Sequence, residues 1–255
     1  MNKLRKLWEN KNPNLLAIYF MAGYPDIEST VPMIEYLTQS EVDIIEIGFP
    51  FSDPLADGAV IQAASQKAIQ KGMNLKLLFQ QLSQLQNIST PLILMGYLNP
   101  VLQMGIPQFL EQCSLHQIDG LILPDMPLEF YEKHFQAEMN DRDISSIFLV
   151  TPSTPVERLQ KICDLTTGFI YVVSDHSITG KEVNFEKQKN YYEKIQNYLK
   201  EKPKMIGFGI RDKKSFEMAC QYANGAIIGT EFLKFIEKQS VSLESIQKFI
   251  QTIKL

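Results

Sequence analysis

Eight short apolar runs, separated by segments of helical periodicity, predict an α/β fold of the (β/α)8 class, the TIM barrel. The runs are rich in Ile, Val, Leu and Phe without strict alternation, which is typical of parallel strands covered on both faces. No shift in composition marks a domain boundary in the 255 residues. We therefore expect one barrel domain over residues 1–255, with strands at 15–21, 44–49, 92–95, 120–123, 146–150, 169–173, 205–208 and 226–228.

Helical segments are expected between these runs. An extra amphipathic helix before residue 15 should close the floor of the barrel. Apolar residues three and four apart predict helices over 31–37 and 75–85, and Ser153-Thr154-Pro155 marks the start of another helix. The polar stretch 182–204 is typical of a solvated helix next to a mobile loop.

Composition describes an ordinary globular chain, with 45% hydrophobic and 21% charged residues. A net charge of −4 without a dense basic run argues against nucleic-acid binding. The basic N-terminus lacks the apolar core of a secretory signal, and no run is long enough to span a membrane. Three scattered cysteines favour reduced thiols over disulfides or a metal site. We expect a soluble, cytoplasmic protein.

Glu46 is the most informative residue, because it is a carboxylate within an otherwise apolar run. Burying it unpaired would cost several kcal/mol, on the order of 1.4 kcal/mol per unit of pKa shift. Such a group either pairs with a buried donor or performs chemistry. The loop behind it adds Asp53 and Asp57, and barrel enzymes gather their active sites at these strand ends.

The last two strand ends predict a phosphate site. Gly207-Phe208-Gly209 follows the seventh run, and Gly229-Thr230 opens a helix after the eighth. Glycine lets backbone amides approach phosphate oxygens, and a helix start supplies N–H donors. A Gly-x-Gly alone often marks only a tight turn, but both elements together favour a phosphorylated substrate.

Several motifs resemble the tryptophan synthase α-subunit family in order and spacing. They are Ala22-Gly23-Tyr24-Pro25, Glu46 through Gly58, Asn99-Pro100, Leu123-Pro124-Asp125-Met126-Pro127, Thr151-Pro152, Ile178-Thr179-Gly180 and Gly207-Phe208-Gly209. The resemblance implies retro-aldol cleavage of indole-3-glycerol phosphate to indole and glyceraldehyde 3-phosphate, a lyase step of tryptophan biosynthesis. It implies no cofactor in this chain and a β-subunit partner that uses pyridoxal phosphate, in an αββα heterotetramer.

The resemblance also assigns residues to roles. Glu46 would be the general acid and base, and Asp57 would accept the indole N–H. Asp53 would serve structure and the subunit interface, and no metal ligand is expected. The indole pocket would be formed by Tyr19, Met95, Tyr97, Asp125, Leu149, Tyr171 and Thr179, and the phosphate would be held by Gly180, Phe208, Gly209, Gly229 and Thr230.

The chain departs from the family pattern in the loop after the sixth run. Asp175 stands where the family usually has Arg, and Ser177 replaces a flexible Gly. This loop would be the lid, whose Thr179 would bond Asp57 on closure, so these changes bear on lid closure. His176 is expected to be a solvated loop residue, and Ala59 stands where Pro is common.

The sequence leaves two other functions open. A stand-alone indole-3-glycerol-phosphate lyase would release free indole, and the altered lid is compatible with it. A catalytically weak barrel could serve chiefly to activate its partner, although Glu46 and Asp57 argue against this. An unrelated phosphate-binding barrel would not explain the loop from Pro50 to Gly58.

Overall fold

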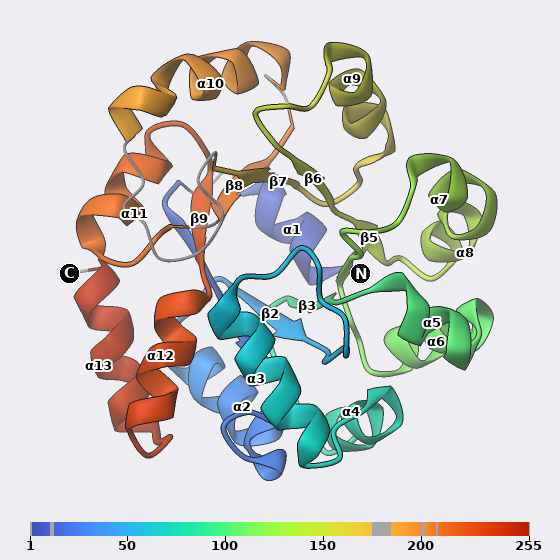
Figure 1. The fold of residues 1–255 in the computed structure, drawn as a ribbon, viewed down its shortest axis with the longest axis vertical. Helices are drawn as coiled ribbons and strands as arrows, with labels where there is room; N and C mark the ends of the chain where they lie inside the picture. The colour runs from blue at the N-terminus through green and yellow to red at the C-terminus, as the bar shows by residue number, and fades with distance from the viewer. Residues whose placement is uncertain (1, 11–12, 175–184, 200–201, 208, 255) are drawn as a thin grey trace.

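Parallel strands form a ring at the centre of the computed structural model, and helices surround the ring (Figure 1). The structure describes residues 2–10, 13–174, 185–199, 202–207 and 209–254. The predicted lid, which includes Asp175, His176, Ser177, Thr179 and Gly180, lies outside the described residues, as does Phe208.

All strand pairs of the sheet are parallel, in the order β5-β4-β3-β2-β1-β9-β8-β7-β6. The TIM-barrel prediction is therefore confirmed, and the strands begin and end close to the predicted residues. They are β1 (Leu15–Met21), β2 (Ile44–Gly48), β3 (Leu92–Met95), β4 (Gly120–Ile122), β5 (Ser145–Ser146), β6 (Phe148–Val150), β7 (Ile170–Val173), β8 (Lys204–Gly207) and β9 (Gly225–Ile228).

The fifth predicted strand differs, because it forms the two short segments β5 and β6 on either side of Ile147. β5 pairs with β4, whereas β6 pairs with β7. At the change of partner, the Ile147 amide donates to the Leu121 carbonyl, and the Ser146 carbonyl accepts from Gly168. β5 and β6 are the two ends of the strand order, so the chain itself joins these ends of the sheet at Ile147. The single predicted strand is therefore divided into two segments with different pairing partners.

Helices alternate with the strands and cover the outside of the ring (Figure 1). They are α2 (Thr30–Gln39), α3 (Ala59–Gln70), α4 (Leu75–Leu82), α5 (Leu98–Met104), α6 (Ile106–Leu115), α7 (Leu128–His134), α8 (Gln136–Asp141), α9 (Val156–Leu165), α10 (Phe185–Tyr198), α11 (Lys213–Cys220), α12 (Thr230–Lys238) and α13 (Leu243–Lys254), with a short 3-10 turn at Ile27–Ser29. In the described part of the chain, no helix has the length and apolar character needed to cross a membrane.

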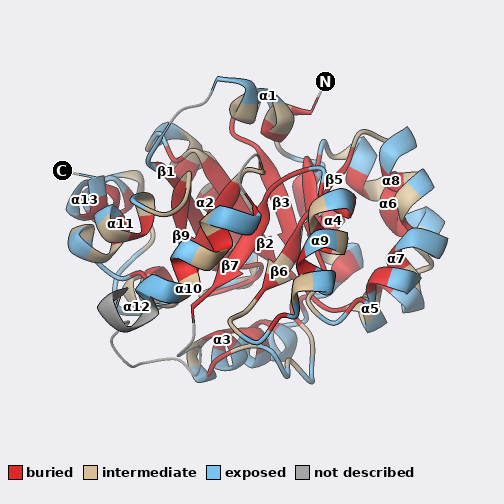
Figure 2. Cartoon of the chain, turned by 90° about the horizontal axis from the view of Figure 1, so that it is seen from above, coloured by how far each residue is buried: buried red, intermediate tan, exposed pale blue. Residues whose placement is uncertain are grey.

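Helix α1 (Lys3–Glu9) lies across the N-terminal ends of the strands (Figure 2). The Asn2 side-chain amide donates to the carbonyls of Asp119 and Asp143, both at 2.6 Å, just before β4 and β5. Leu4 is fully buried against the interior of the ring, with a methyl carbon 3.3 Å from where a Cβ on Gly120 would stand. The helix therefore closes the end of the barrel opposite the predicted site.

We expect Leu4→Ala to lower the free energy of unfolding by about 2–5 kcal/mol, because it leaves a cavity in this floor. Urea unfolding followed by circular dichroism measures the change. Leu115→Ala is the matched control, since Leu115 is 67% exposed on α6 and should shift stability little. An equal effect of both variants would contradict the role of Leu4.

Candidate active site

Glu46 lies on β2 with its side chain inside the barrel, where it is 1% exposed. It is in register with Tyr19 on β1 and Ile93 on β3. Neither carboxyl oxygen has a hydrogen-bond partner among the described residues. Burial, followed by the nearby charge of Asp57, raises the pKa of Glu46 to about 8. Glu46 is therefore largely protonated at neutral pH.

Asp57 lies in the loop between β2 and α3, close enough to Glu46 for their charges to interact. Burial raises its pKa to about 6, while a hydrogen bond from the Tyr97 hydroxyl acts in the opposite direction. The same hydroxyl accepts from the Ala56 amide at 2.9 Å. Asp57 is therefore mainly ionised at neutral pH, in contrast to Glu46.

Three tyrosines surround the two carboxyl groups. Burial raises the pKa of Tyr19, Tyr97 and Tyr171 well above the usual range, and the charge of Asp57 adds to each shift. Their phenols therefore stay protonated at neutral pH. The carboxyl groups lie among neutral hydroxyl groups and apolar carbon atoms. In such surroundings of low dielectric constant, the charge of one carboxyl group acts strongly on the pKa of the other.

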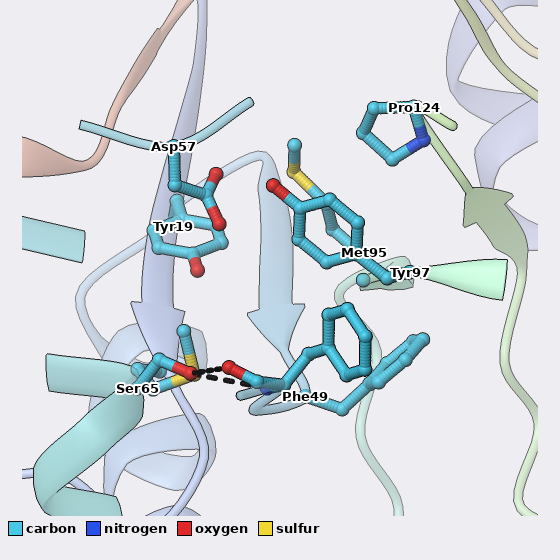
Figure 3. A pocket seen from close by; sticks show the side chains of 10 residues that line it. Tyr19, Phe49, Asp57, Ser65, Met95, Tyr97 and Pro124 are labelled. Carbon is cyan, nitrogen blue, oxygen red and sulfur yellow. Dashed lines mark hydrogen bonds between the residues drawn. The ribbon is translucent and has the colours of Figure 1, made fainter. Parts of the chain in front are cut away.

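A small pocket opens beside Asp57 at the C-terminal ends of β1 to β3 (Figure 3). In Figure 3 the Asp57 side chain is seen above the Tyr19 ring, with Met95 and Tyr97 on the other side of the pocket. The lining is largely aromatic and apolar, and it consists of Tyr19, Met21, Phe49, Phe51, Asp57, Ser65, Met95, Gly96, Tyr97 and Pro124. Such a surface suits a flat aromatic group with one polar edge.

Aromatic side chains pack directly over glycines at the ends of neighbouring strands. A Cβ added to Gly48 would lie 2.3 Å from the Tyr19 hydroxyl oxygen, and one added to Gly207 would lie 2.1 Å from that of Tyr171. A Cβ on Gly96 would lie 2.2 Å from the Phe49 ring. The position of each ring therefore requires the absence of a side chain on the next strand.

The predicted phosphate residues that are described lie together at the ends of β8 and β9. Gly209 has a φ of +75°, a conformation that favours glycine. Gly229 directly precedes α12 and Thr230 is its first residue, so backbone N–H groups of the helix start are at this rim. Within the described residues, no group of three or more His, Cys, Asp or Glu side chains is placed to hold a metal ion.

The remaining predicted pocket residues differ in exposure. Tyr171 is buried on β7, in register with the half-buried Leu149 on β6. Asp125 is exposed, and its carboxylate accepts from the Leu98 amide, with oxygens at 2.9 and 3.1 Å. The structure thus places Asp125 at the start of α5, where it fixes that helix next to Tyr97.

Six residues that line the pocket were not among the predicted site residues: Met21, Phe49, Phe51, Ser65, Gly96 and Pro124. Phe49 and Phe51 lie in the same motif as Asp57, so their closeness to Asp57 in the sequence could have indicated that they line the pocket. Ser65 had a weaker signal, as the one hydroxyl on the buried face of α3 beside Ile61, Ala64 and Ala68.

The pKa of Glu46 predicts a pH-dependent stability. The unfolded chain ionises Glu46 near the usual pKa of 4.5, whereas the folded chain does so at about 8. Between these values the unfolded state binds fewer protons, so the contribution of Glu46 to stability falls as pH rises. Glu46→Gln cannot ionise, and its stability relative to wild type should rise by up to about 1.4 kcal/mol per pH unit across this window.

Urea unfolding at several pH values between about 5 and 8 measures this difference. Glu157→Gln, at an exposed position on α9, is the control for the loss of a glutamate. A stability difference for Glu46→Gln that stays constant with pH would contradict the raised pKa.

The sequence of this chain is similar to those of known proteins. Residues 5–254 match the family model described as tryptophan synthase alpha chain. The tryptophan synthase alpha chain of Flavobacterium psychrophilum is 45% identical over 256 residues, covering 99% of this chain and 100% of the relative. That of Bacteroides fragilis is 44% identical over 241 residues, covering 94% of this chain and 92% of the relative.

Solved structures give the same result. Tryptophan synthase subunit alpha from Legionella pneumophila superimposes with a TM-score of 0.87 at 31% identity, covering 99% of this chain and 97% of that one. The tryptophan synthase A-subunit of Pyrococcus furiosus gives a TM-score of 0.82 at 31% identity, covering 95% and 98%. The family match spans nearly the whole chain and includes Glu46 and Asp57, so this chain belongs to the tryptophan synthase alpha chain family.

Proposed function

We propose that Glu46 and Asp57 carry out the lyase reaction of this family, the retro-aldol cleavage of indole-3-glycerol phosphate to indole and glyceraldehyde 3-phosphate. The observation that carries the proposal is the buried Glu46 carboxyl, whose pKa of about 8 lies close to neutral pH. An acid–base catalyst works best when its pKa is near the working pH. The placement of Glu46 and Asp57 at the active end of a barrel supports the same roles.

Glu46 serves both proton transfers. As a carboxylic acid it donates its proton to C3 of the indole ring, and as a carboxylate it accepts the proton of the glycerol C3′ hydroxyl. The bond between C3 and C3′ then breaks, its electron pair passes into the ring, and the hydroxyl carbon becomes the aldehyde. The proton balance at Glu46 is zero over the cycle.

Asp57 stabilises the charge that develops on the substrate. Protonation at C3 leaves positive charge on the ring nitrogen, whose N–H donates to the Asp57 carboxylate. The lower pKa of Asp57, about 6, keeps this group ionised while Glu46 is protonated. The two carboxyl groups thus hold different protonation states at one pH, as acid–base pairs in enzymes do.

The remaining predicted contacts complete the proposal. Tyr19, Met95, Tyr97 and Tyr171 enclose the indole, and amides near Gly209, Gly229 and Thr230 hold the phosphate. The chemistry moves only protons and an electron pair between carbon atoms, so we assign no cofactor to this chain. Pyridoxal phosphate belongs to the partner β subunit.

Two exposed leucines support a partner surface at the active end. Leu55, in the loop that carries Asp57, is 93% exposed, and Leu102 on α5 is 45% exposed. The hydrogen bond between Ala56 and Tyr97 links this loop to the start of α5. We assign this surface to the β subunit of an αββα heterotetramer that works in the cytoplasm.

Glu46→Gln should fold normally and lose about 10²- to 10⁴-fold in kcat, because an amide cannot transfer the proton. Indole release from indole-3-glycerol phosphate measures this loss, and Glu157→Gln should retain wild-type turnover. A Glu46→Gln variant that keeps more than about a tenth of the wild-type rate would refute the assigned role.

Adding the β subunit from the same source should produce a larger species by light scattering and faster cleavage. A tenfold activation requires the β subunit to bind the active state of this chain more tightly than the inactive state by about 1.4 kcal/mol. Leu55→Asp should abolish both effects, whereas Leu115→Asp, at an exposed position on α6, should preserve them. If wild type shows neither effect, the stand-alone lyase becomes the better description.

A further inference from the structure

Ser65 is a buried hydroxyl on the inner face of α3. Its side chain is 1% exposed, and its Oγ accepts from the Phe51 amide at 3.0 Å and donates to the Phe51 carbonyl at 2.9 Å (Figure 3). Both hydrogen bonds go to the backbone of one residue, 14 positions earlier in the chain. A single side chain thus fixes the start of the loop that carries Asp57.

Gln62 lies one turn earlier on α3 and holds the other end of this loop. Its side-chain amide donates to the Asp57 carbonyl at 2.8 Å and to the Pro54 carbonyl at 3.3 Å. Residues three apart on a helix project from the same face. Ser65 and Gln62 therefore hold the loop from Phe51 to Asp57 against α3 at two points.

The position of Phe51 is coupled to that of Asp57 through Tyr97. The Phe51 and Tyr97 rings pack with centroids 5.3 Å apart at an angle of 31°. The Tyr97 hydroxyl accepts from the Ala56 amide at 2.9 Å and also bonds the Asp57 side chain. Tyr97 packs against Phe51 and bonds Asp57 through its hydroxyl. A shift of Phe51 would therefore displace Tyr97 and, with it, this hydrogen bond to Asp57.

We infer that Ser65 is a positioning residue for the reaction and acts on Asp57 through Phe51 and Tyr97. An alanine would fill this place on the helix, as Ala64 and Ala68 do on the same buried face. The hydroxyl adds two hydrogen bonds to a loop that follows the strand without regular structure of its own. The inference rests on the proposed role of Asp57, because it states what holds that carboxylate in place.

The kinetic test compares three variants at position 65. Ser65→Ala and Ser65→Cys remove or weaken the hydrogen bonds, and both should lower kcat for indole-3-glycerol phosphate about tenfold with a smaller change in KM. Ser65→Thr keeps the hydroxyl and should retain most of the turnover. Ser83→Ala, which removes a hydroxyl bond at the end of α4, is the control and should match wild type. Wild-type kcat in the alanine variant would overturn the inference.

Amide hydrogen exchange on the full chain tests the coupling independently of activity. In Ser65→Ala, the Phe51 and Ala56 amides should both exchange several-fold faster, while the Ala22 amide, bonded to the Gly48 carbonyl on β2, should be unchanged. Faster exchange at Phe51 alone would show that the effect stops before Asp57 and would overturn the inference. Failure of the wild-type protein to cleave the substrate would count against the proposed function, and the exchange data would still decide the coupling.

Discussion

Burial of the Glu46 carboxyl inside a ring of parallel strands is the constraint on which the active end of this barrel depends. An unpaired carboxylate in such surroundings costs several kcal/mol, so the group takes up a proton instead. The strand register sets this environment, because Tyr19 and Ile93 are the direct neighbours of Glu46 on both sides. A raised pKa follows from the position of this residue within β2.

The difference between Glu46 and Asp57 has a simple structural origin. Glu46 comes from a strand, whose backbone groups are already used in the sheet, and no amide of the described residues donates to its carboxyl group. Asp57 comes from a loop, where the Tyr97 hydroxyl reaches it and offsets part of the cost of burial. Strand and loop thus provide two carboxyl groups of different acidity within one site.

Sequence patterns predicted the barrel because parallel strands buried on both faces leave continuous apolar runs. Glu46 was found because a charge is conspicuous in such a run. The interruption at Ile147 could not be predicted, because an isoleucine fits equally well within a continuous strand and at a point where the strand changes its pairing partner. Ser65 was missed for the opposite reason, since one hydroxyl on a helix resembles a surface residue until the fold brings Phe51 against it. Asp125 was assigned to the pocket from its motif. Its hydrogen bond from the Leu98 amide could not be predicted, because it depends on how the loops after β3 and β4 lie relative to each other.

The interruption at Ile147 also divides the ring into two arcs. One arc contains β1 to β5 and the other β6 to β9, and they meet again where β1 pairs with β9 over four register positions, from Leu15 with Gly225 to Ile18 with Ile228. A chain divided at residue 147 would keep each arc's internal ladder intact, with Glu46 and Asp57 in the first piece and the residues proposed to hold phosphate, Gly209, Gly229 and Thr230, in the second. The barrel thus consists of two complementary arcs, and only their association brings the two carboxyl groups and the proposed phosphate residues into one site.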